Sequence, residues 1–167
     1  LEAPSGEGLW QYSAYPTRNA TNAPRLNDIT TGSDVHFSEI FPVSSSDGSS
    51  APDGEWIELY NSGTVAIDLN GWSIMNGMGN VTYLDPGSIV FNSSQGSTTI
   101  DAGERRLVEF TGDTRLMDNY NHLILRNAAE SIVDMAHYTT NYVTNVSFIQ
   151  SQNYYDPWSP SIAPSPG

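Results

Sequence analysis

Short stretches in which apolar and polar side chains alternate run along the chain from Val35 onward. In residues 55–60, for example, Ile57 and Leu59 fall on one face and Glu58 on the other, which is the two-residue period of a half-buried β-strand. Gly, Asn and Asp separate most stretches at intervals of about 8–12 residues, a spacing typical of an all-β sandwich or barrel. No segment has a convincing helical period. The predicted strands are 9–15, 35–41, 55–60, 65–69, 72–75, 81–84, 88–91, 98–100, 106–110, 122–125, 132–138 and 142–149.

The alternation also predicts the core of the fold. Side chains on the apolar face of each strand should pack against the opposite layer, and Arg106 should stand at the mouth of its strand. The expected inward residues are Ile40, Ile57, Leu59, Trp72, Ile74, Arg106, Val108, Phe110, Leu123, Leu125 and Ile132.

The chain divides into three parts by the texture of its sequence. Residues 1–34 are interrupted by prolines and glycines and are expected to form an extended N-terminal arm, a candidate donor strand. Residues 35–138 hold the regular alternation and should form the β-sandwich. Residues 139–167 add one further strand and end in a proline-rich, extended tail.

The charge of the chain narrows the classes of function. Its 167 residues include 19 acidic and 6 basic side chains, all six of them arginines, which gives a formal net charge of −13. Nucleic-acid binding relies on cations that neutralise phosphates, so it is largely excluded, and docking on anionic membranes is disfavoured for the same reason. No apolar run is long enough to insert into a bilayer. The absence of cysteine excludes disulfides, thiolate zinc sites and cysteine nucleophiles.

Several features favour a location outside the cell. The chain begins at Leu1 without a leader, and we expect that a signal peptide has been removed, with an excised fragment as the alternative. Lysine is absent and four Asn-x-Ser/Thr sequons occur, although a chain so rich in Asn, Ser and Thr would contain about this many by chance. We therefore expect an extracellular or cell-surface protein. The candidate glycosylation sites are Asn19, Asn80, Asn92 and Asn145.

Two motifs within the predicted sandwich are specific enough to indicate a family. The order E-W-I-E-L-Y-N-S-G at 55–63 is followed by I-D-L-N-G-W-S-I at 67–74. An Asp-Ala-Gly turn follows at 101–103, and residues 123–134 have the pattern of a hairpin. Over about residues 35–138 the chain thus resembles the lamin tail domain family. The resemblance implies an immunoglobulin-like β-sandwich, here with extended N- and C-terminal tails.

What this family does narrows the expected function further. Its animal members belong to nuclear filament proteins, whereas its prokaryotic, extracellular members resemble adhesive or accessory modules on secreted and surface proteins, often beside nucleases or other hydrolases. This chain has no lysine, no basic patch and no heptad rod, so it does not fit the nuclear branch. The resemblance implies the prokaryotic extracellular type and no enzyme activity, although likeness of fold alone does not settle function.

The residues capable of catalysis form no recognisable site in the sequence. No G-x-S-x-G nucleophile motif occurs. Glu55 and Glu58 are three residues apart on one strand and face opposite sides, so they cannot share a substrate. We interpret the strand glutamates as solvated carboxylates: Glu39, Glu55 and Glu58. A zinc site is not expected, because no zinc-type spacing links the three histidines, His36, His122 and His137.

Calcium is the metal ion that the sequence suits best. Three loops combine carboxylates with Asn or Gly, and Ca²⁺ takes about six to eight oxygen ligands of these kinds. None of the loops matches the D-x-[DN]-x-[DN]-G pattern, so solvated turns are the alternative interpretation. The candidate ligands are Asp28, Asp34, Asp47, Asp53, Asp113 and Asp118.

Large aromatic side chains stand out in both polar ends of the chain. Aromatic residues are favoured as buried anchors of protein interfaces. We expect one tail to add as a strand, or to wrap, onto the sandwich of the next copy, with packing of the tails on their own domain as the alternative. The candidate interface residues are Trp10, Tyr12, Tyr15, Tyr154, Tyr155 and Trp158.

The sequence therefore predicts a non-enzymatic, self-assembling subunit of an extracellular filament, sheath or surface layer, joined by tail or strand exchange. The expected partners are copies of the chain, with neither nucleic acid nor membrane insertion. The alternative is a surface- or carbohydrate-binding accessory module of a secreted hydrolase. Trp56 and Tyr60 share one strand face and would supply the aromatic platform that sugar binding needs, unless a neighbouring segment covers them.

Overall fold

The computed structural model describes residues 34–43, 54–86, 97–110, 116, 120–139, 144–149 and 158–161. Every regular element within these ranges is a β-strand, as predicted. No helix in this part of the chain is long and apolar enough to cross a membrane. The strands are β1 (Val35–Phe41), β2 (Glu55–Asn61), β3 (Ile67–Asp68), β4 (Ser73–Asn76), β5 (Val81–Tyr83), β6 (Thr99–Ile100), β7 (Arg105–Phe110), β8 (Tyr120–Arg126), β9 (Ile132–Thr139), β10 (Ser147–Ile149) and β11 (Ser159–Ser161).

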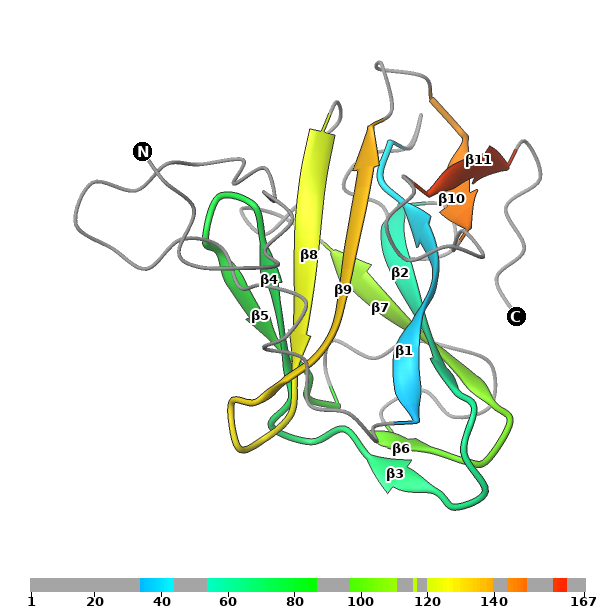
Figure 1. The fold of residues 1–167 in the computed structure, drawn as a ribbon, viewed down its shortest axis with the longest axis vertical. Coiled ribbons are helices and arrows are strands. Elements are labelled where there is room, and N and C mark those ends of the chain that lie inside the picture. Colours follow the sequence, from blue (N-terminus) through cyan, green and yellow to red (C-terminus); the bar gives the residue numbers. More distant parts are fainter. Residues whose placement is uncertain are drawn as a thin grey trace, which may run out of the picture.

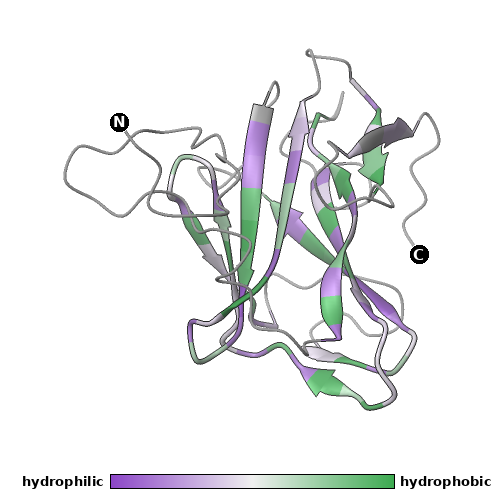
Figure 2. Cartoon of the chain, viewed as in Figure 1, coloured by the Kyte–Doolittle hydropathy of each residue, from purple (hydrophilic) through white to green (hydrophobic). Residues whose placement is uncertain are grey.

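The strands form two layers (Figure 1). One layer is an antiparallel sheet with the order β11-β10-β1-β2-β7, and the other has the order β5-β4-β8-β9. The short strands β3 and β6 pair with each other at one end of the molecule. Apolar and polar segments alternate along several strands, as Figure 2 shows. The fold is the immunoglobulin-like β-sandwich that the sequence predicted.

One hydrophobic core lies between the two sheets. Ile57 and Val108 of the first sheet and Ile74 and Leu123 of the second belong to the same buried cluster. Arg106 is buried at the end of β7, and its Nη1 pairs with the Glu104 carboxylate at 3.0 Å. The expected core residues are therefore confirmed, apart from Ile132.

A register shift in the β8–β9 hairpin explains the error at Ile132. Leu125 lies opposite Asp134, whereas the next residue, Arg126, lies opposite Ile132, so Val133 is an extra residue on β9. The extra residue forms a β-bulge and enters the core, while Ile132 stays half-buried outside the core. Alternation counted along the sequence does not include such an extra residue and therefore assigned the wrong side chain.

A second bulge lies on β1, and it determines which residue lies opposite Glu58. Phe37 lies opposite Leu59 and Glu39 opposite Glu58, so Ser38 is the extra residue. The glutamates Glu39, Glu55 and Glu58 are only 3%, 1% and 2% exposed. The expectation that they are solvated was therefore wrong. Glu39 and Glu58 lie on the outer face of β1 and β2, which have strands on both sides. Glu55 lies on the inward face of β2 with Ile57, and its Oε2 accepts the Leu116 N–H at 2.8 Å.

The C-terminal segment adds two strands to the first sheet. β10 pairs with β1, and β11 pairs with β10 with Pro160 opposite Phe148. Proline lacks the N–H that a central strand must donate, so its place in β11, at the end of the described sheet, is the one that a sheet tolerates. Trp158, just before β11, is buried in the main core. The predicted strands 9–15 and 88–91 lie outside the described residues.

We predict that Leu59→Ala lowers the free energy of unfolding by about 2–5 kcal/mol, because it opens a cavity in the fully buried core. Urea denaturation of the purified chain measures this change. Val65→Ala is the control, since Val65 is 62% exposed and its truncation should change stability by less than about 0.5 kcal/mol. Equal losses in the two variants would contradict the assigned core.

Candidate binding surface

A polar cluster centred on Glu58 covers part of the outer side of the first sheet. The Ser38 hydroxyl donates a hydrogen bond to Glu58 Oε1 at 2.5 Å, and Arg105 Nε pairs with the same oxygen at 3.0 Å. The Arg105 guanidinium lies over the Tyr60 ring at 4.5 Å, and the His36 ring meets Tyr60 edge-on at 5.3 Å. Burial, more than the nearby Arg105 charge, lowers the pKa of His36. These side chains are bound to one another by the hydrogen bond, ion pair and ring contacts just described, so we assign them a structural role.

The aromatic platform that a sugar-binding module needs is not exposed on this side of the sheet. Trp56 is 0% exposed and stacks on Phe41, with ring centroids 5.4 Å apart, and Leu107 completes a small buried cluster. Tyr60 is half-buried beneath Arg105. The two aromatic residues proposed from the sequence therefore serve packing in this structure.

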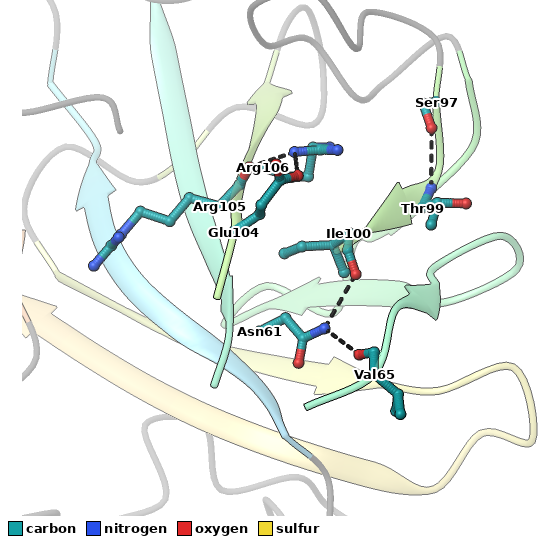
Figure 3. A network of polar contacts seen from close by, with 8 residues as sticks. All are labelled: Asn61, Val65, Ser97, Thr99, Ile100, Glu104, Arg105 and Arg106. Carbon is teal, nitrogen blue, oxygen red and sulfur yellow. Dashed lines mark hydrogen bonds and ion pairs between the residues drawn. The ribbon is translucent and has the colours of Figure 1, made fainter. Parts of the chain in front are cut away.

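The asparagine of the E-W-I-E-L-Y-N motif ties two turns together (Figure 3). Asn61 Nδ2 donates to the carbonyls of Val65 at 2.8 Å and Ile100 at 3.1 Å. Asn61 Oδ1 accepts the Gly63 N–H at 3.0 Å. These bonds close the turn after β2 and join it to β6, so the motif is explained by the fold and requires no ligand.

The second sheet presents a surface of a different character. Its side chains facing away from the core form rows across the strands, since Val81 lies beside Met75, Met75 beside Ile124, and Ile124 beside Met135. We call this surface the acid-free face. Its residues are Ser73, Met75, Val81, Tyr83, His122, Ile124, Arg126, Ile132, Met135 and His137. Of these, Val81 and Tyr83 are exposed, Ser73 and Ile124 are buried, and the others are half-buried. None of them is a carboxylate, although the whole chain has a net charge of −13.

The acid-free face ends at an exposed edge strand. Within the described part of the chain, β5 pairs only with β4 and forms the border of the sheet. Val81 and Tyr83 on β5 are 41% and 63% exposed, and Met78 in the preceding turn is 66% exposed. An edge strand with exposed apolar side chains is a template for the addition of another strand. The acid-free face and β5 together form the candidate binding surface.

Most of the calcium candidates cannot be placed. Asp34 is exposed just before β1, and its backbone carbonyl accepts the Ser62 N–H at 2.8 Å. No group of three or more potential metal-binding side chains occurs among the residues that the structure describes. The candidates outside those residues are Asp28, Asp47, Asp53, Asp113 and Asp118.

Two of the four sequons are visible. Asn80 is exposed in the turn between β4 and β5, and Asn145 is exposed with a left-handed φ of 58°. A glycan on Asn80 would cover the edge of β5, whereas one on Asn145 would not, since Asn145 precedes β10 in the other sheet. Asn19 and Asn92 lie outside the described ranges.

Of the six aromatic interface candidates, the structure describes one. Trp158 is 7% exposed and packs in the core of its own chain, where its backbone N–H donates to the His137 backbone carbonyl at 3.5 Å. This position is the self-packing arrangement that the sequence left open. The other five lie outside the described segments: Trp10, Tyr12, Tyr15, Tyr154 and Tyr155.

Reasoning from the sequence missed the acid-free face. Alternation within one strand shows only which of its residues face inward, whereas the composition of this face depends on how four strands pair. A signal was present, because the outward positions of residues 122–125 and 132–138 hold no carboxylate. The pairing of His122 with His137 was missed for the same reason, since they are distant in sequence.

A buried carboxylate joins the two sheets beneath this surface. Asp134 Oδ2 accepts the Phe37 N–H from β1 at 2.8 Å, and Oδ1 accepts the Met135 N–H at 2.8 Å. Burial raises the pKa of Asp134 to about 6, and the two N–H donors offset this rise only in part.

We predict that the contribution of Asp134 to stability falls as the pH rises. The folded chain holds the Asp134 proton up to a pKa of about 6, against an ordinary value of 3.8. Stabilisation by protonation is therefore complete below pH 3.8 and is lost through pH 6, by about 3 kcal/mol. The measurement is the difference in unfolding free energy between wild type and Asp134→Asn, followed from pH 4 to 7. A difference that stays constant, or grows with pH, would contradict the raised pKa.

Comparison with known proteins bears on the same region of the chain. A family model described as Lamin Tail Domain matches residues 29–140. No curated protein and no solved structure matches the chain. The matched range contains β1 to β9 and the whole acid-free face, while β10 and β11 lie beyond it. The family resemblance found in the sequence is thereby confirmed.

Proposed function

Because the chain belongs to the lamin tail domain family of immunoglobulin-like structural domains, we propose that it is a non-enzymatic structural subunit outside the cell. Its partners are copies of itself in a filament, sheath or surface layer, joined by strand or tail exchange. The acidic, lysine-free composition supports the extracellular location. The observation that carries the proposal is the acid-free face with its exposed edge at β5.

Electrostatic repulsion limits where two copies can meet. Each chain has a net charge of −13, and contacts between carboxylate-bearing surfaces of like-charged copies are unfavourable. The acid-free face avoids this cost. Two β5 strands placed edge to edge would be self-complementary, since an antiparallel pair related by a two-fold axis presents the same residues from both copies. Such a pair would continue the sheet and bring the exposed Val81 and Tyr83 of both copies together.

The described part of the C-terminal segment bears on which of the two tails would be the donor to a neighbouring copy. Trp158 and β11 are packed on their own chain, so these described residues of the C-terminal segment are not the donors. The aromatic residues of the N-terminal arm therefore remain the candidate donors to a neighbouring copy. Tail exchange from the N-terminal arm and edge pairing at β5 together would give each copy more than one contact, as a polymer requires.

We predict that Val81→Asp weakens self-association by at least about tenfold, because it places a carboxylate on the edge of the acid-free face. The association constant is measured by sedimentation velocity over a range of concentrations, on protein produced without glycans so that Asn80 leaves the edge open.

Val65→Asp is the matched control. It adds the same charge at an exposed valine, but in the turn after β2 and away from the acid-free face. Its association should equal that of the wild type. A wild-type chain that stays monomeric at every concentration would refute self-assembly, and equal weakening by both variants would refute the role of β5.

We further predict that deletion of residues 1–20 abolishes long polymers, because it removes the aromatic residues of the N-terminal arm. Electron microscopy of the truncated and full-length chains shows the result, and thermal unfolding confirms that the truncated sandwich is folded. Filaments that persist after the deletion would rule out an N-terminal donor while leaving edge pairing at β5 in place.

The alternative function, a carbohydrate-binding accessory module of a secreted hydrolase, finds less support. The aromatic platform that the sequence proposed for sugar binding was the pair Trp56 and Tyr60. Trp56 is buried, and Tyr60 lies beneath the Arg105 guanidinium. We therefore prefer the structural subunit.

A further inference from the structure

Two of the three histidines lie side by side on the acid-free face. His122 on β8 and His137 on β9 are direct partners in the antiparallel register, in the long strand pair that Figure 1 shows. The neighbouring partners Leu123 and Ala136 point into the core. Because side chains alternate along a strand, both imidazoles point to the opposite side, which is the acid-free face.

The backbone around His137 shows whether His122 and His137 are a hydrogen-bonded or a non-hydrogen-bonded cross-strand pair. The His137 carbonyl accepts the N–H of Trp158, so it points away from β8. In an antiparallel pair the N–H and carbonyl of one residue point to the same side, so His122 and His137 form a non-hydrogen-bonded pair. In such pairs the Cα atoms are about 4.5 Å apart and the side chains come closest together.

The surroundings of the two rings keep them neutral, and Gly77 shows how the His122 ring is turned. A Cβ at Gly77, which directly follows β4, would lie 2.7 Å from Asn121 Oδ1 and 3.4 Å from His122 Nδ1, so this nitrogen faces the end of β4. With Nδ1 on the side of β4, the Nε2 edge of the ring lies on the side of β9. Burial lowers the pKa of both histidines, and the nearby His137 lowers that of His122 further. Both rings are thus in the unprotonated form that binds metal ions at pH 7.

We propose that His122 and His137 form a binding site for a divalent transition-metal ion of the Cu²⁺ or Zn²⁺ class. Metal–imidazole bonds of about 2.0–2.1 Å require the two ligand nitrogens to be roughly 3 Å apart, a separation that side chains of a non-hydrogen-bonded pair reach. Imidazole is a preferred ligand of these ions. Water fills the remaining positions, since no third His, Asp or Glu joins the pair among the described residues. The site belongs to a single chain and does not depend on self-assembly.

The test is a titration of the full-length chain with Cu²⁺ alone, followed by isothermal calorimetry. His122→Gln and His137→Gln should each weaken the tightest binding step by at least about tenfold. His36→Gln is the matched control, since His36 is also half-buried on a strand but lies in the other sheet against Tyr60. This variant should bind like the wild type. Far-UV circular dichroism confirms that all three variants fold.

A spectroscopic measurement on the wild type makes the test independent of the variants. Electron paramagnetic resonance of the chain with one equivalent of Cu²⁺ should show coupling to two imidazole nitrogens, and to one in either single variant. Binding that is unchanged in His122→Gln and His137→Gln, or equally weakened in His36→Gln, would overturn the proposal. Coupling to no nitrogen would do the same, because it would assign the ion to the carboxylates of this acidic chain.

Discussion

Two single-residue register shifts decide which side chains share a face in this sandwich. In a β-strand every side chain points opposite to its neighbours, so one extra residue reverses the assignment of all residues beyond it. The extra residues are Ser38 on β1 and Val133 on β9. One shift lies in the β1–β2 strand pair of the first sheet, and the other lies in the β8–β9 strand pair of the second sheet. The polar cluster, the core and the acid-free face all depend on these two positions.

The bulge at Ser38 places an uncharged hydroxyl where it can reach a buried charge. With Ser38 inserted, Glu39 lies opposite Glu58, and like charges opposite each other are unfavourable. The Ser38 hydroxyl and Arg105 both bind Glu58 Oε1, which compensates that carboxylate. The same insertion keeps Ile40 in the main core and turns Phe41 outward onto Trp56. One inserted residue thus places a hydroxyl on the buried Glu58 carboxylate and contributes to a second apolar cluster.

The sequence predicted the fold class, the strand positions and nearly all core residues, because alternation and turn residues are local properties. It failed where pairing between strands decides the outcome. A hairpin without the bulge, continued from the Arg126–Ile132 pair, would place His122 opposite Ala136 and not opposite His137. Burial of Glu39 and Glu58 likewise could not be read from the sequence, since it depends on which strands flank β1 and β2. Family motifs could not supply this information, because Asn61 and its neighbours hold turns together and report on the fold alone.

The distribution of charge links the fold to its function more closely than the net charge does. A net charge of −13 opposes close approach of copies, and at physiological salt this repulsion is screened beyond about 8–10 Å. Within that distance a contact avoids this repulsion where both surfaces lack carboxylates. The second sheet satisfies this condition because Asp134, the acidic residue on β9, is turned inward by the bulge at Val133 and bound by the Phe37 N–H. Without the bulge, the register continued from the Arg126–Ile132 pair would place Asp134 opposite Ile124, on the outward side of β9, and the face would gain a negative charge. The inserted valine therefore keeps this surface free of acid.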